Sequence, residues 1–158
     1  MKQLYLLLAV AASMFAALSC DQYEDGKPSD NVLSRFEKMY PNAYDIEWEL
    51  EGIYWEVSFD TGSYPNVKEH TAWFKADGTW LRTETELHVS AVPDAIKQYL
   101  QASEYGSALL QDTEIDYVQT PEGNFYQFEL LYNGVVIKVN VTPDGNVSVA
   151  NAADYMFF

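Results

Sequence analysis

Cysteine is almost absent from this chain of 158 residues, which contains a single one, Cys20. One cysteine cannot form a disulfide within the chain, so the fold has to be stable without that cross-link. Basic residues are scarce too, because nine Lys and Arg stand against 24 Asp and Glu and leave a formal net charge of −15. A negative field of this size repels nucleic-acid phosphates, so we exclude nucleic acid as a partner.

Patterns of catalytic and metal-binding residues are also missing from the sequence. The two histidines, His70 and His88, fall on different predicted strands, whereas a zinc site needs three or four ligands. We therefore favour hydrogen-bonded or surface histidines. No serine lies in a G-x-S-x-G pattern, and the glycines are not gathered into a phosphate-binding loop. We predict no catalytic residue, no metal site and no cofactor, in a protein that is not an enzyme.

Carboxylates are plentiful, and some of them are close together in the predicted fold. Asp45, Glu47 and Glu49 are expected on one side of a strand, with Glu56 beside them. Such a group can act as a general acid and base or bind calcium. No EF-hand loop accompanies it, and acidic residues are frequent throughout the predicted surface. We therefore favour a solvated sheet face.

The sequence opens with a short basic start and an uncharged apolar run over residues 4–18. This run of roughly 15 residues suits the core of a signal peptide and is shorter than the roughly 20 residues of a membrane-spanning helix. It ends in Ala17-Leu18-Ser19-Cys20, which resembles a bacterial lipobox. We predict a signal peptide over 1–19 and lipidation at Cys20. The alternative is an ordinary secretory signal with a chance cysteine.

A lipidated Cys20 implies an exported protein, anchored in the cell envelope of a Gram-negative bacterium. We expect the outer membrane, on its periplasmic side or at the cell surface, with membrane contact only through the lipid. Residues 20–30 are acidic and contain Gly and Pro, so we predict a tether there.

The remaining chain shows one pattern twice. Ser29 or Asp30 can cap a helix that stops at Pro41, and alternating residues then predict strands over 45–50, 53–60, 71–76 and 79–87. A second helix opens at Pro93, followed by strands over 112–119, 124–132, 135–142 and 146–150. We predict an α+β fold of two tandem units, residues 31–88 and 89–158. Each unit is a helix followed by a four-stranded antiparallel meander, with the helices on one face of the sheet.

The aromatic motifs of the first unit resemble those of the PepSY-like group of bacterial exported proteins, also described as beta-lactamase-inhibitor-protein-like. The matching segments are Tyr40-Pro41-Asn42-Ala43, Trp48-Glu49, Tyr54-Trp55-Glu56-Val57, Ala72-Trp73-Phe74 and Asp77-Gly78-Thr79-Trp80. The resemblance extends over nearly the whole mature chain. It implies a sheet face that grips another protein, in the manner of an inhibitor, or a small regulatory module in the envelope.

The strand pattern leaves aromatic side chains on the sheet face that no helix is expected to cover. Alternation places Tyr54 and Glu56 outward on one strand and Trp73 and Lys75 outward on another, and Phe125 is outward by equivalence between the units. We predict that these five residues bind an unidentified envelope protein, such as an enzyme. Two alternatives stay open: residues 155–158 or a loop cover this face, or a cleft between the units binds a small molecule or a cation.

The position of Trp80 depends on the hairpin register. A two-residue loop at Asp77-Gly78 pairs Lys75 with Trp80 and places Trp80 outward, whereas a three-residue loop with a bulge at Gly78 pairs Phe74 with Trp80 and buries it. By analogy with the hairpin at Pro143, we favour the buried position.

Overall fold

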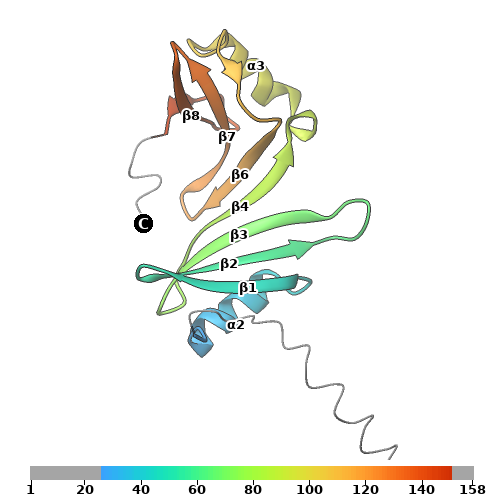
Figure 1. Cartoon of the computed structure of the whole chain (residues 1–158), viewed down its shortest axis with the longest axis vertical. Coiled ribbons are helices and arrows are strands. Elements are labelled where there is room, and N and C mark those ends of the chain that lie inside the picture. Colours follow the sequence, from blue (N-terminus) through green and yellow to red (C-terminus); the bar gives the residue numbers. More distant parts are fainter. Residues whose placement is uncertain (1–25, 151–158) are drawn as a thin grey trace, which may run out of the picture.

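The computed structural model of this protein describes residues 26–150 (Figure 1). Within this range nine strands form one antiparallel sheet in the order β1-β2-β3-β4-β6-β7-β8-β9, with β5 paired to β7. The predicted signal peptide, Cys20 and residues 155–158 lie outside the described range. In the part of the chain that is described, no helix is both long and apolar enough to cross a membrane.

The α+β fold predicted from the sequence is confirmed. The helices are α2 (Asp30–Met39) and α3 (Asp94–Ala102), with a short 3-10 helix, η1 (Val89–Ala91), ahead of α3. The strands are β1 (Tyr44–Glu51), β2 (Tyr54–Thr61), β3 (Lys68–Lys75), β4 (Trp80–His88), β5 (Leu109–Leu110), β6 (Glu114–Thr120), β7 (Gly123–Tyr132), β8 (Val135–Val141) and β9 (Val147–Val149). Figure 1 shows α2 with β1–β4 in one half of the molecule and α3 with β6–β8 in the other.

Helix α2 forms where its capping residues and apolar spacing predict it. The Ser29 hydroxyl accepts a hydrogen bond from the Val32 N–H, so it caps the first turn. The helix ends at Met39, two residues before Pro41, because proline has no N–H to continue the ladder. Its buried face carries Val32 and Phe36.

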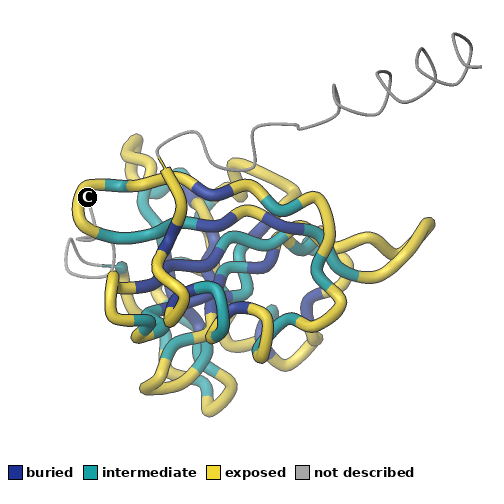
Figure 2. Tube along the Cα trace, turned by 90° about the horizontal axis from the view of Figure 1, so that it is seen from below, coloured by how far each residue is buried: buried dark blue, intermediate teal, exposed yellow. Residues whose placement is uncertain are grey.

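Each helix packs on its own apolar cluster. The Phe36 ring meets Trp48 edge-on at 5.3 Å and Phe59 at 5.0 Å, so aromatic pairs hold α2 to the sheet. Figure 2 shows buried positions along the middle of the strands and exposed ones at the turns. The α2 cluster contains Val32, Phe36, Trp48, Val57, Phe59, Ala72 and Phe74. The α3 cluster contains Val92, Ile96, Ile115, Phe128, Leu130, Val139 and Val141.

Both clusters lie on the same face of the sheet, since directly paired residues of neighbouring strands share a face. Ala72 of the α2 cluster pairs with Thr83 of β4. Leu87, four residues further along the same strand, pairs with Ile115 of the α3 cluster. We call this side the helix face and the other side the open face. The prediction that the helices share one face is therefore correct, and the pairing of β4 with β6 makes the two halves one continuous sheet. The division into two repeated units stays a prediction.

The hairpin between β3 and β4 has the register that buries Trp80. Phe74 pairs with Trp80, and the Gly78 N–H donates to the Lys75 carbonyl at 2.9 Å, closing a three-residue loop. Gly78 has a φ of +90°, a conformation that L side chains rarely adopt. The partly buried Trp80 ring packs against the α2 cluster.

Two short elements are not apparent from the sequence. β5 lies in the segment between α3 and β6, where we predicted no strand, and η1 precedes α3. A strand of two residues, Leu109–Leu110, is too short to show alternation.

Candidate functional site

The centre of the open face is a polar network around Trp73. The indole N–H of Trp73 donates a 2.7 Å hydrogen bond to the Glu56 carboxylate, and the Arg82 guanidinium lies 4.4 Å from the centre of the indole ring. Arg82 also forms an ion pair with Glu84. These four residues come from β2, β3 and β4, and Glu56, Trp73 and Arg82 are paired directly across those strands.

The prediction that Trp73 is an exposed aromatic is wrong. Its face is correct, because it lies opposite the helices, but only 4% of its surface is exposed. The physical reason is a bulge between Trp73 and Phe74 in the pairing with β4. This bulge lets Trp80 face the core while Arg82 stays on the open face directly opposite Trp73, so the long side chain of Arg82 covers the ring.

Of the other predicted interaction residues, Tyr54, Glu56 and Lys75 lie next to Trp73 on the paired strands β2 and β3, whereas Phe125 lies apart from them. Tyr54 is half-buried and pairs with Lys75, which is exposed at the end of β3. Glu56 is half-buried against Trp73. Phe125 is also half-buried, but strands β4 and β6 separate it from β3. The open face therefore presents Tyr54 and Phe125 as two separate aromatic positions.

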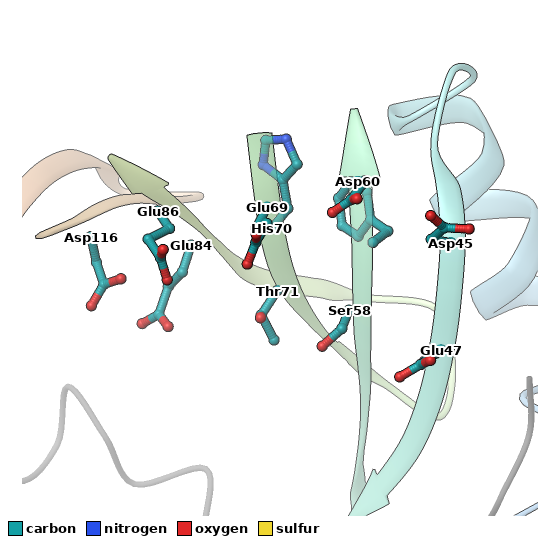
Figure 3. A pocket seen from close by; sticks show the side chains of 11 residues that line it. Asp45, Glu47, Ser58, Asp60, Glu69, His70, Thr71, Glu84, Glu86 and Asp116 are labelled. Atoms are coloured by element: carbon teal, nitrogen blue, oxygen red, sulfur yellow. The ribbon is translucent and has the colours of Figure 1, made fainter. Parts of the chain in front are cut away.

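Carboxylates line two adjoining hollows on the open face. The first, of about 270 Å³, extends from β1 to β6 (Figure 3). The second, of about 180 Å³, continues to β7 and β8 and shares Glu86 and Asp116 with the first. We call the strip of carboxylates along both hollows the acidic groove: Asp45, Glu47, Asp60, Glu69, Glu84, Glu86, Asp112, Glu114, Asp116 and Glu129.

Crowding of these acids changes their protonation. A hydrogen bond with Glu114, together with burial and the repulsion of that carboxylate, raises the pKa of Glu86 to about 7. Burial raises the pKa of Glu84 and of Asp116. The positive charge of Arg82 offsets part of this effect at Glu84, and Lys138, followed by Arg82, offsets part of it at Asp116. The carboxylates of the groove outnumber the basic side chains that act on them, Arg82 and Lys138. The negative potential of the groove therefore attracts protons and cations.

Neither histidine contributes a free ring to this face. The His70 ring nitrogens lie 2.7 Å from the Thr61 hydroxyl and 2.9 Å from the Thr85 hydroxyl, and the ring stacks on Phe59. Figure 3 shows the ring on the side of the sheet opposite to Thr71. Burial, with the nearby charge of Lys68, lowers the pKa of His70 and favours the neutral ring. His88 caps η1 through Ser90. Within residues 26–150, no three His, Cys, Asp or Glu side chains are grouped to hold a metal ion.

Gln127 is a buried polar residue on the open face, and strand alternation alone did not predict its burial. It is 4% exposed and lines the second hollow. Its Nε2 donates to Asn140 Oδ1 at 2.8 Å, while its buried Oε1 accepts no hydrogen bond from any described residue. Gln127 lies two residues after Phe125 and so shares its face, and the strands paired on both sides of β7 bury it.

Residues 26–150 form an α+β protein with one antiparallel sheet. Its two α-helices pack on one face, and the opposite face is polar. The chain belongs to the family described as "Putative beta-lactamase-inhibitor-like, PepSY-like", whose sequence profile matches residues 53–148. The resemblance noted in the aromatic motifs is therefore confirmed. No curated protein matches the chain.

Solved structures from Bacteroides share the fold. A BLIP-like protein from Bacteroides fragilis is 24% identical, with a TM-score of 0.70 over 82% of this chain and 90% of that one. A DUF2874 family protein from Bacteroides ovatus is 19% identical, with a TM-score of 0.67 over 83% and 99%. One from Bacteroides eggerthii, described among "putative periplasmic proteins", is 24% identical, with a TM-score of 0.64 over 80% and 90%. Identities this low establish the fold alone.

Proposed function

We propose that this protein is a non-enzymatic binding protein of the cell envelope, which holds another protein against the open face of its sheet in the manner of an inhibitor. The observation that carries the proposal is the open face itself. In the described chain both helices lie on the opposite side, and the open face presents an ordered polar network and an acidic groove. A face that is broad and ordered, and that neither described helix covers, suits a protein partner better than a small ligand, which needs a deep pocket.

The network around Trp73 supports this proposal by keeping the face rigid. Glu56, Arg82 and Glu84 are held by hydrogen bonds, an ion pair and the indole ring. Side chains fixed before binding lose little entropy when a partner arrives. In this role Trp73 is a support beneath the surface, and the half-buried Tyr54 and Phe125 are the aromatic contacts.

The location of the protein is the second part of the proposal. The chain is exported and anchored at the outer membrane through a lipid on Cys20. Support comes from the signal-like start of the sequence, the lipobox-like Ala17-Leu18-Ser19-Cys20 and the name of the Bacteroides eggerthii relative. The anchor places the open face where envelope proteins are its available partners.

The third part of the proposal concerns the architecture. The fold is a tandem of two units, residues 31–88 and 89–158, joined edge to edge through β4 and β6. It is supported by the order of the elements, in which each helix precedes its own strands, and by the separate apolar cluster under each helix. On this basis the open face is formed by both units together.

The alternative of a small molecule or cation in a cleft between the units has less support. The acidic groove does draw residues from both halves. Among residues 26–150, however, no group of three potential ligands is arranged around a metal position.

A pull-down from envelope extract tests the proposal. The bait is the exported chain, as wild type, as Tyr54→Ala with Phe125→Ala, and as the control Tyr99→Ala. Tyr99 of α3 lies on the helix side and is 38% exposed. We expect wild type and Tyr99→Ala to capture the same partner and the double variant to lose it. Capture of the same protein by all three baits, or loss only in the control, would contradict the proposal.

A further inference from the structure

We propose that the acidic groove binds a lysine- or arginine-rich segment of the partner protein, with one ammonium or guanidinium group seated between Glu86, Asp116 and Gln127. This inference rests on the proposed function and specifies the chemistry of the partner. Its first support is charge complementarity. The chain carries a formal charge of −15, and the groove concentrates carboxylates from several strands on one surface.

The second support is the buried amide of Gln127. Only 4% of Gln127 is exposed. Its Nε2 donates to Asn140, whereas its buried Oε1 has no hydrogen-bond partner in the described chain. An acceptor left unsatisfied in a buried position is costly, so a donor is expected there. Lys and Arg side chains carry only donors.

The acidic neighbours of Gln127 favour a cationic donor. Its cross-strand neighbour on β6 is Asp116, and Asp116 in turn pairs with Glu86 on β4. Gln127 lines the second hollow, so a donor that approaches its buried Oε1 from there lies beside these carboxylates and near Lys138. A charge-assisted hydrogen bond from an ammonium or guanidinium satisfies both the amide and the acids.

Repulsion between the acids of the groove also fits a cationic partner, although Lys138 lines the second hollow with them. Glu86 shares a hydrogen bond with Glu114, which raises the pKa of Glu86, and Glu69, Glu84 and Asp116 are the other acids near it. The positive charges that act on these acids come from Arg82, already paired with Glu84, and from Lys138 on β8. A cation bound between Glu86 and Asp116 would reduce the repulsion among these carboxylates.

The length of the groove favours a protein segment over a single ion. Its lining residues come from β1, β2, β3, β4 and β6 in the first hollow and reach β7 and β8 in the second. An extended chain with several basic side chains can contact the whole strip, whereas one small cation occupies one position. Electrostatic contacts of this kind set partner choice and association rate.

A peptide-binding experiment with the full exported chain tests the inference. The probe is a fluorescein-labelled peptide of alternating Gly and Lys, and its control is the same peptide with every Lys acetylated. We expect the Lys peptide to bind at least tenfold more tightly than the acetylated one, with an affinity that falls as NaCl rises. Glu86→Gln with Asp116→Asn should weaken binding at least fivefold. Glu37→Gln, which removes an exposed acid on α2 of the helix side, should change it less than twofold.

Equal binding of the two peptides, or equal weakening by Glu37→Gln and by the groove variant, would overturn the inference. The pull-down distinguishes this failure from failure of the proposed function. If Tyr54 and Phe125 are needed for capture but the Lys peptide does not bind, the open face binds a partner of different chemistry. If the Lys peptide binds but no protein is captured through the open face, the assignment to a protein partner is wrong.

Discussion

The Trp73 indole N–H donates a 2.7 Å hydrogen bond to the Glu56 carboxylate, across the paired strands β2 and β3. This contact joins the largest aromatic ring at the centre of the open face to an acid whose pKa burial raises. The ring is therefore part of the structure beneath the binding surface, and its removal should affect stability before it affects binding.

Replacement of Trp73 by Ala should lower the free energy of unfolding by about 3–5 kcal/mol, because the side chain is 4% exposed and its loss leaves a cavity under Arg82. Urea denaturation followed by circular dichroism measures this change. Tyr54→Ala, on the same face but half-buried, is the control and should cost less. A loss below about 1 kcal/mol for Trp73→Ala would contradict the burial described above.

Glu86 should make stability depend on pH between 4.5 and about 7. Its pKa is raised from 4.5 to about 7 in the folded protein, so the folded state holds the proton more tightly than the unfolded state. The contribution of this group to stability is then fully present below pH 4.5 and is lost as pH rises through about 7. Thermal unfolding of wild type and Glu86→Gln at pH 5 and pH 8 measures this effect.

We expect Glu86→Gln to raise the melting temperature at pH 8, where Glu86 and Glu114 would otherwise both be charged, and to change it little at pH 5. The variant should also flatten the dependence of stability on pH over this range. An equal shift at both pH values would show that the two carboxylates do not interact.

Gly78→Ala should destabilise the protein more than Gly52→Ala. Both glycines have positive φ, +90° at Gly78 and +62° at Gly52. A Cβ added at Gly78 would lie 2.9 Å from the Asn31 carbonyl oxygen, whereas a Cβ added at Gly52 would have no described atom beyond its chain neighbours within 4 Å. We expect a loss of about 2–3 kcal/mol at Gly78 and about 1 kcal/mol at Gly52. Urea titration of both variants measures these losses, and equal losses would mean that the close approach of α2 to this hairpin is absent.

Cys20→Ala should move the protein from the membrane fraction to the soluble fraction of the envelope, since the lipid is its predicted attachment. Fractionation followed by immunoblotting measures the distribution, and Lys27→Arg, which lies outside the lipobox-like motif and keeps the cysteine, is the control. Retention of Cys20→Ala in the membrane fraction would exclude the anchor.

Local patterns in the sequence predict much of this fold. The cap at Ser29, the stop at Pro41 and the alternation of strands place α2 and the sheet close to where they lie, since each depends on residues near in sequence. The face of Trp73 was predictable for the same reason. Its burial was not, because it depends on how the bulge in the hairpin places Arg82 opposite the ring.

The acidic groove was only partly visible in the sequence. Its acids on β1 could be grouped by alternation, but Glu86, Asp116 and Gln127 come together through the pairing of β4 with β6 and of β6 with β7. Pairing between strands distant in sequence is set by tertiary structure, which no local period reports. The strand β5 was not predicted, because its two residues are too few to show the alternation of apolar and polar side chains.

In-cell photo-crosslinking tests the central claim, that the open face binds a protein, most directly. A benzoylphenylalanine replaces Tyr54 on the open face or Tyr99 on the helix side, in the full chain, and adducts are identified by mass spectrometry after irradiation. We predict one discrete protein adduct from position 54 and none of that mass from position 99. The same adduct from both positions, or an adduct from position 99 alone, would contradict the claim.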